Sequence, residues 1–144
     1  MSRVAEVVRL FFEKVLTTKN FGQCLKNVQI LSAADGRCKA QFTVAEENIN
    51  VVGSLHGGFT STVIDCVSSY ALLSKDSSDI PKATVSVDLH VTFLKAAFPG
   101  ETVTVDAKTI HAGRSLAFLA VELTKNDGKD VIARGQHTKY FLKA

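Results

Sequence analysis

The first residues of the chain have the apolar spacing of a helix. Apolar side chains from Val4 to Val15 recur at intervals of three and four, with charged residues between them. This spacing predicts an amphipathic helix over about residues 2–18, which the sequence Asn-Phe-Gly at 20–22 then ends. We expect the helix to pack on its own domain rather than to lie on a membrane surface.

Beyond residue 27 the pattern changes to the period of two that is typical of β-strands. The turn sequence Ala-Asp-Gly-Arg at 34–37 predicts a hairpin, and residues 85–93 alternate between apolar and polar side chains. The connections between the later strands are too short for crossover helices, so these strands should form an antiparallel meander. They cover about residues 102–110, 116–124 and 130–142.

A second helix is predicted between the two groups of strands, over residues 56–74, and it is apolar on nearly every face. The 144 residues therefore predict one α+β domain spanning 1–144. In it a long buried helix lies against an antiparallel sheet of five or six strands, with an extra N-terminal helix. One helix cannot cover both faces of such a sheet, so we expect a second copy of the chain to cover part of it.

Asp65 is the one carboxylate of the buried helix. At about 100° per residue it falls in one narrow stripe with the small residues Gly58, Ser61 and Ser68. A carboxylate that loses hydration there must find partners or its pKa rises, and both outcomes suit a general base. The alternative is a carboxylate bonded to Ser61 or Ser69 that serves only to pair helices.

The start of this helix, His56-Gly57-Gly58, offers unpaired backbone N–H groups. The Gly57 N–H could hold a carbonyl oxygen that becomes an oxyanion, although a tight turn with positive φ also explains the glycines. Asp65 lies roughly 12 Å further along the helix. One helix cannot bring both groups to one atom, but two antiparallel copies can, with Gly57 of one facing Asp65 of the other.

Composition and motifs exclude several other classes of function. The net charge of +3 comes without a Lys/Arg block, which argues against nucleic-acid binding. Apolar stretches are shorter than the roughly 20 residues of a membrane span. Three cysteines without a CxxC pair indicate reduced thiols in a cytosol-like compartment. The histidines have no zinc-binding spacing and no nucleotide-binding motif occurs, so we expect neither metal nor cofactor.

The motif Asn-x-x-Gly-x-Leu-His-Gly-Gly at 50–58, followed by Asp65 and by Val-Ser-Val-Asp-Leu at 85–89, resembles the hotdog-fold acyl-CoA thioesterases. The similarity is to their small single-domain phenylacetate-pathway type and covers nearly the whole chain, including the tail Gly-Gln-His-Thr-Lys at 135–139. It implies a hotdog fold, with the sheet wrapped around the central helix. It also implies a homodimer that assembles into a homotetramer and hydrolyses fatty acyl-CoA without metal.

The resemblance also implies roles for single residues. Gly57 and Asn50 would bind and polarise the thioester carbonyl, and His56 would support their loop. Asp65 of the neighbouring chain would orient or deprotonate the attacking water, with Ser86 helping to place it. From the residues alone, Asn50 could equally be a turn or capping residue, and Ser86 a solvated hydroxyl on the polar face of its strand.

Coenzyme A would lie along surface loops in this family, with Lys95 and Arg114 as partners for its phosphates. The residues that the resemblance places against it are Ser86, Phe93, Leu94, Lys95, Ala96, Ala97, Phe98, His111, Ala112, Gly113, Arg114, Ser115, Leu116 and Tyr140.

The function expected from these features is hydrolysis of medium- to long-chain fatty acyl-CoA. The alternative is a non-catalytic acyl-CoA or fatty-acid binding module on the same fold. A hotdog hydratase acting on enoyl-CoA is disfavoured. Those enzymes use an Asp/His pair within one loop–helix segment, and no such pair accompanies Asp65 here. We expect a cytoplasmic protein, or one associated with mitochondria, without integral membrane association. A lipid-transfer protein docked on the N-terminal helix is a further expectation.

Overall fold

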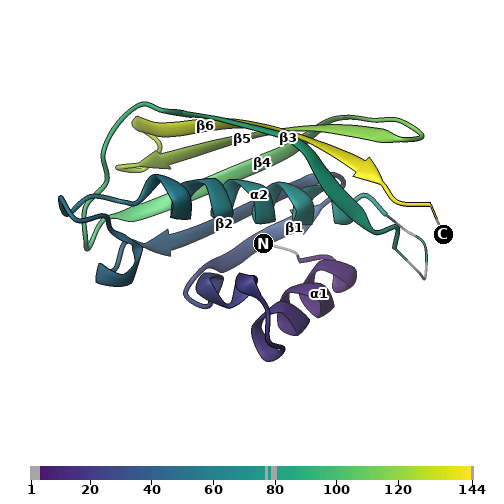
Figure 1. Ribbon diagram of the computed structural model, residues 1–144, viewed down its shortest axis with the longest axis horizontal. Helices are drawn as coiled ribbons and strands as arrows, with labels where there is room; N and C mark the ends of the chain where they lie inside the picture. The colour runs from purple at the N-terminus through teal and green to yellow at the C-terminus, as the bar shows by residue number, and fades with distance from the viewer. Residues whose placement is uncertain (1–3, 77, 79–80, 144) are drawn as a thin grey trace.

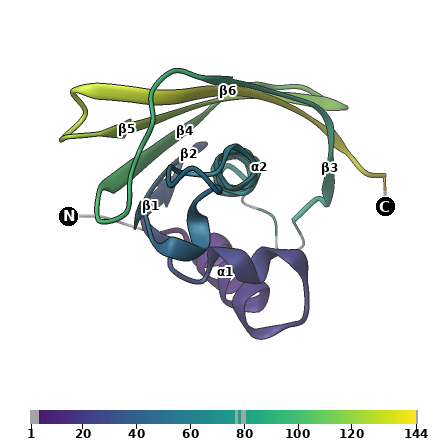
Figure 2. The same ribbon diagram turned by 60° about the vertical axis from the view of Figure 1, so that its left-hand side comes forward.

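A six-stranded antiparallel sheet curves around one long helix in the computed structural model, which describes residues 4–76, 78 and 81–143 (Figures 1 and 2). The strand order is β1-β2-β4-β5-β6-β3. This arrangement confirms the predicted α+β hotdog architecture. The elements are α1 (Glu6–Thr17), η1 (Phe21–Leu25), β1 (Gln29–Ala34), β2 (Arg37–Thr43), η2 (Glu46–Asn48), α2 (Gly57–Leu73), β3 (Thr84–Phe93), β4 (Thr102–Ala112), β5 (Leu116–Lys125) and β6 (Asp130–Phe141).

The core lies between α2 and the concave face of the sheet. Val63, Ile64 and Val67 of α2 are fully buried there. Ile64 rests directly on β6 at Gly135, where a Cβ atom would lie 2.6 Å from Ile64 Cγ2. Because no side chain fits in this gap, Gly135 fixes how closely α2 approaches β6.

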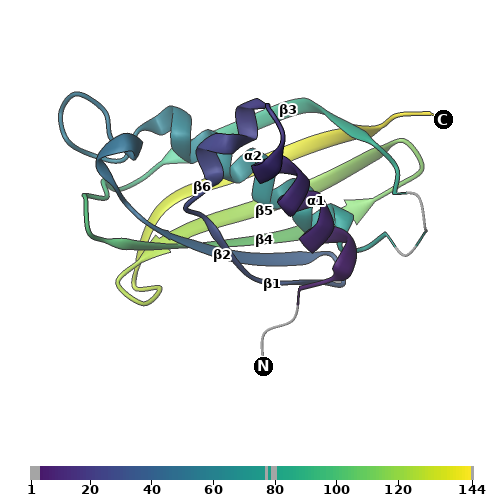
Figure 3. The ribbon, with the colours of Figure 1, turned by 90° about the horizontal axis from the view of Figure 1, so that it is seen from below.

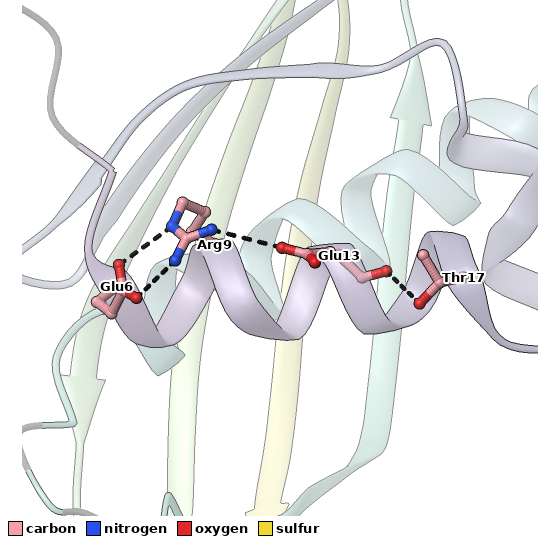
Figure 4. Close-up of polar contacts among 4 residues, drawn as sticks. All are labelled: Glu6, Arg9, Glu13 and Thr17. Atoms are coloured by element: carbon pink, nitrogen blue, oxygen red, sulfur yellow. Dashed lines mark hydrogen bonds and ion pairs between the residues drawn. The ribbon is translucent and has the colours of Figure 1, made fainter.

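The N-terminal helix packs on its own domain, as predicted, on the side of α2 that faces away from the sheet (Figure 3). Phe11 and Phe12 meet Tyr70 edge to face, with ring centroids 6.1 and 5.6 Å apart. The opposite face carries charges, and Arg9 bonds Glu6 there at 2.6 Å (Figure 4). No helix among the described residues has the length and apolar character to cross a bilayer.

The prediction that the first helix includes residues 4 and 5 is wrong, because α1 begins at Glu6. Val4 forms a parallel bridge with Ala33, and the Ala5 N–H donates to the Ala33 carbonyl at 2.7 Å. Pairing with β1 holds these residues extended, so the helix begins at Glu6. Residues 2 and 3 lie outside the described residues.

The predicted meander of β4, β5 and β6 is confirmed, with one boundary moved. His111 and Ala112 belong to β4 rather than to a turn, because they pair with Phe118 and Ala117 of β5. β3 pairs with β6 and forms an edge of the sheet. Most of its side chains are exposed, including those of Val85, Val87, Leu89 and Phe93. An edge strand with exposed apolar side chains indicates that another protein surface covers it.

Candidate active site

The start of α2 presents one unused backbone donor. His56 is the N-cap, and its Nδ1 accepts the Gly58 N–H at 2.7 Å. Among the described residues no hydrogen bond uses the Gly57 N–H. Positive φ occurs at Gly53 and at neither Gly57 nor Gly58, so the tight-turn explanation of these two glycines is wrong. His56 caps the helix through this bond, and Gly57 keeps a donor that points out of the helix.

Asn50 holds the loop that precedes α2. Its Oδ1 accepts the N–H groups of Val52 and Ser54, both at 3.1 Å, and its Nδ2 donates to Ser54 Oγ at 3.0 Å. These bonds make it a turn residue, the alternative considered from the sequence. In the single chain the amide of Asn50 is occupied by its own loop.

The segment Phe93–Phe98 runs beside the start of α2. The ring of Phe93 covers Gly57 so closely that a Cβ on Gly57 would lie 3.3 Å from it. The Leu55 N–H donates to the Ala97 carbonyl at 2.8 Å. Lys95 Nζ lies 2.8 Å from Asp130 Oδ1, so this lysine already has a carboxylate partner. A cavity of about 390 Å³ opens between this segment and the start of α2. We call Asn50, His56, Gly57 and Phe93–Phe98 the amide half.

Asp65 presents a carboxylate that no hydrogen bond holds among the described residues. Its side chain is 44% exposed, which differs from the dehydrated carboxylate expected. Ser61 Oγ donates to the Gly57 carbonyl and Ser69 Oγ to the Asp65 backbone carbonyl. Neither serine bonds the carboxylate, so the helix-pairing alternative through them is wrong for the single chain.

His137 is the polar residue closest to Asp65 that the sequence analysis did not assign. Its ring is fully buried, and Nε2 lies 3.9 Å from Asp65 Oδ1. Nδ1 lies 2.8 Å from Ser68 Oγ, and Nε2 lies 2.7 Å from Ser86 Oγ. Burial lowers the pKa of His137, which favours the neutral imidazole. Ser68 therefore faces β6 and not a partner, although the predicted stripe grouped it with Asp65.

Ser86 lies on the inner face of β3 because of a bulge. The pairing of β3 with β6 shifts register between Ser86 and Asp88, which leaves Val87 as an extra residue. The bulge interrupts the alternation, so Ser86 faces the same side as buried Lys139, its partner on β6. Ser86 remains exposed to solvent in the single chain, and its hydroxyl lies 2.7 Å from His137 Nε2.

Asp65 also borders an apolar cavity of about 380 Å³ between α1, α2 and β6. Phe11, Tyr70 and Phe141 supply its apolar walls. Lys139 lies buried beside it, with Nζ 2.5 Å from Ser69 Oγ. Burial lowers the pKa of this lysine.

The residues predicted to bind coenzyme A fall into two groups, one near each end of β4. Tyr140 pairs with Val85 and Leu116, and the Phe141 N–H donates to the Ser115 carbonyl. The segment His111–Leu116 therefore lies beside the end of β6, the strand that pairs with the start of β3. The amide half lies at the other end of β4, a strand that spans roughly 35 Å (Figure 1). We call Asp65, Ser86, Tyr140 and His111–Leu116 the carboxylate half.

Comparison with known proteins agrees with this fold. The protein-family model for the thioesterase superfamily matches residues 52–132 of the sequence. The chain belongs to the thioesterase superfamily. It is 34% identical to human acyl-coenzyme A thioesterase 13 over 98% of this chain and 99% of that protein. Zebrafish thioesterase superfamily member 2 superposes with a TM-score of 0.87 at 35% identity, covering 98% of this chain and 100% of that one.

A more distant neighbour shows the fold alone. The structure of a hypothetical thioesterase protein with coenzyme A from Streptococcus pneumoniae has a TM-score of 0.80 at 20% identity, covering 92% of this chain and 95% of that one. The family match includes Gly57, Asp65 and Ser86, whereas His137 and Lys139 lie beyond it. Membership confirms the resemblance found in the sequence and indicates hydrolysis of a thioester.

The described residues of this family member bring no three His, Cys, Asp or Glu side chains into a group that could hold a metal ion. The three cysteines are free thiols. Burial raises the pKa of both Cys38 and Cys66 to about 12, which makes their thiolates rare at neutral pH. The candidate groups of the site are Gly57, Asp65 and Ser86.

Proposed function

We propose that the chain hydrolyses medium- to long-chain fatty acyl-CoA at a site shared by two copies. The observation that carries this proposal is the separation of two free groups on one helix. The Gly57 N–H and the Asp65 carboxylate lie eight residues apart, which is roughly 12 Å of helical rise. Neither group has a hydrogen-bond partner among the residues that the structure describes, and neither can reach an atom held by the other.

A twofold axis near Ser61 would complete the site. Two antiparallel copies of α2 that cross there place Gly57 of one copy opposite Asp65 of the other. The same operation pairs the free edges of two β3 strands and covers their exposed apolar side chains. It also brings the segment Phe93–Phe98 of one copy beside His111–Leu116 of the other, which joins the two halves of the predicted coenzyme A site.

The reaction follows from these positions. The Gly57 N–H donates to the thioester carbonyl oxygen and stabilises the negative charge that develops on it. Asp65 of the second copy accepts a proton from water, whose oxygen forms a bond to the carbonyl carbon. The carbon–sulfur bond then breaks, and the sulfur leaves with the proton as free coenzyme A while the acyl group leaves as a fatty acid.

The lining of the two cavities supports an acyl-CoA as the substrate. The cavity beside Asp65 has apolar walls from Phe11, Tyr70 and Phe141 and lies within the usual size of ligand pockets, about 300–1,000 Å³, which suits a fatty acyl chain. Lys95 and Arg114 supply positive charge for the phosphates. Human acyl-coenzyme A thioesterase 13, which is named for this activity, aligns with nearly the whole chain.

Exposed apolar side chains on the outer face of the sheet favour a second interface. Ile110, Leu116 and Phe118 lie on neighbouring strands there. Such a patch supports the assembly of two dimers into a tetramer.

A panel of acyl-CoA chain lengths, assayed for free thiol, tests the proposed function. We expect thiol release that rises from short to medium and long chains. Asp65→Asn should lower kcat by about 10²–10⁴-fold and leave the oligomer intact. Wild-type turnover in Asp65→Asn would refute the role of Asp65 as base. Stoichiometric binding of acyl-CoA without thiol release would show a binding module instead.

A further inference from the structure

The two polar contacts of Ser68 favour one tautomer of His137. Ser68 Oγ has a single hydrogen, and it donates this hydrogen to the backbone carbonyl of Asp65 at 3.0 Å. Ser68 Oγ also lies 2.8 Å from His137 Nδ1. Both contacts are hydrogen bonds only when Nδ1 donates and Ser68 Oγ accepts, which is the tautomer of the neutral ring with its proton on Nδ1.

Nε2, on the other side of the ring, then sets the direction in which the Ser86 hydroxyl points. Nε2 of this tautomer has a lone pair and no hydrogen. Its 2.7 Å bond to Ser86 Oγ is made by the serine proton, which points at the ring. Ser86 therefore offers its oxygen lone pairs, and not its hydrogen, to the space beside Asp65.

We infer that His137 is a positioning residue, held by Ser68, that keeps Ser86 as a hydrogen-bond acceptor for the attacking water. This inference rests on the proposed function. The water has two hydrogens, of which one goes to the Asp65 carboxylate and the other is held by Ser86 Oγ. With both hydrogens directed away, the water turns an oxygen lone pair to the thioester carbon.

The charges around His137 come from three elements. Asp65 on α2 and Asp88 on β3 raise its pKa, whereas Lys139, its neighbour on β6, lowers it. Burial is the largest influence, and the pKa lies below its ordinary value. The ring is therefore neutral at neutral pH. Protonation of Nε2 would make the ring a donor on both sides, and Ser86 would have to turn its hydrogen toward the water.

Nitrogen-15 NMR of the histidine rings tests this assignment without any assay of activity. At pH 8 the signals of His137, identified by their loss in His137→Gln, should show a protonated Nδ1 and an unprotonated Nε2. Ser86→Ala should shift the Nε2 signal, because it removes the hydrogen bond to that atom. A ring protonated on Nε2 would overturn the inference.

Two variants of His137 separate positioning from packing. The amide of His137→Gln reaches the place of Nε2 and can still accept from Ser86, whereas that of His137→Asn ends near the place of Nδ1. We expect His137→Asn to lower kcat by roughly 10- to 100-fold with little change in KM, and His137→Gln to retain more activity. Equal losses in the two variants would contradict a role through Ser86.

A double-mutant cycle completes the test. In a Ser86→Ala background, His137→Asn should cause no further loss of kcat, because the residue that it positions is already absent. A loss of the same factor in both backgrounds would overturn the inference. If the wild-type protein releases no thiol, the proposed function fails and the role in placing water fails with it, while the NMR spectrum still decides the hydrogen-bond assignment.

Discussion

Replacing Gly57 with proline removes the proposed oxyanion donor and little else. Gly57 is the first residue of α2, where the backbone N–H has no partner within the helix. Proline is well tolerated at this position because its φ is already helical. The preceding residue must be extended, and His56 is, with φ −69° and ψ 131°. Gly57→Pro should therefore leave the helix in place.

The expected size of the effect follows from the chemistry of the missing donor. Loss of one oxyanion donor lowers kcat by about 10²–10³-fold, which is about 2.7–4 kcal/mol of transition-state stabilisation. Gly57→Ala is the matched control, since it keeps the N–H and adds the Cβ in the same place. That Cβ would lie 3.3 Å from the ring of Phe93, which is 57% exposed and can move aside. We expect Gly57→Ala to keep most of the activity.

The assay is the steady-state release of free thiol from a saturating acyl-CoA, with size-exclusion chromatography to check the oligomer. Proline should lower kcat far more than alanine at an unchanged elution volume. Equal activity of the two variants would refute the role of the Gly57 N–H, because they differ chiefly in that donor.

Three further predictions concern stability and binding. Gly135→Ala should destabilise the fold by about 1–3 kcal/mol in urea unfolding at fixed protein concentration, since its Cβ would clash with Ile64; an unchanged midpoint would contradict this. Asp130→Asn should lower KM about two- to fivefold by freeing Lys95, and Lys95→Met should raise it; the opposite signs would exclude a phosphate contact. The pKa of His137 is lowered by folding, so its contribution to stability should be complete above pH 6.5 and decline as pH falls below it; His137→Gln should remove this decline.

The fold could be predicted from the sequence because its elements are locally encoded. The period-two pattern of β3 and the buried character of α2 are visible in short windows, and the turns between β4, β5 and β6 are short enough to fix their order. The position of β3 beside β6 is not encoded in this way. It depends on pairing across some fifty residues, as between Ser86 and Lys139.

The candidate site was predictable only in part for the same reason. Gly57 and Asp65 stand out because they are unusual residues of an apolar helix. His137 reaches Ser68 across 69 positions of the chain, and no local pattern joins them. One signal was available, namely that Gly135, His137 and Lys139 alternate along β6 at positions that face the core. The bulge at Val87, which turns Ser86 inward, has no such signal.

Mixing two inactive variants tests most directly whether the site is shared between copies. Gly57→Pro and Asp65→Asn damage opposite halves, so a mixed dimer contains one site with both changes and one intact site. After denaturation and joint refolding in equal amounts, we expect recovery of about one quarter of wild-type activity, since half of randomly formed dimers are mixed. Recovery no greater than that of the separately refolded variants would contradict a site built from the amide half of one copy and the carboxylate half of another.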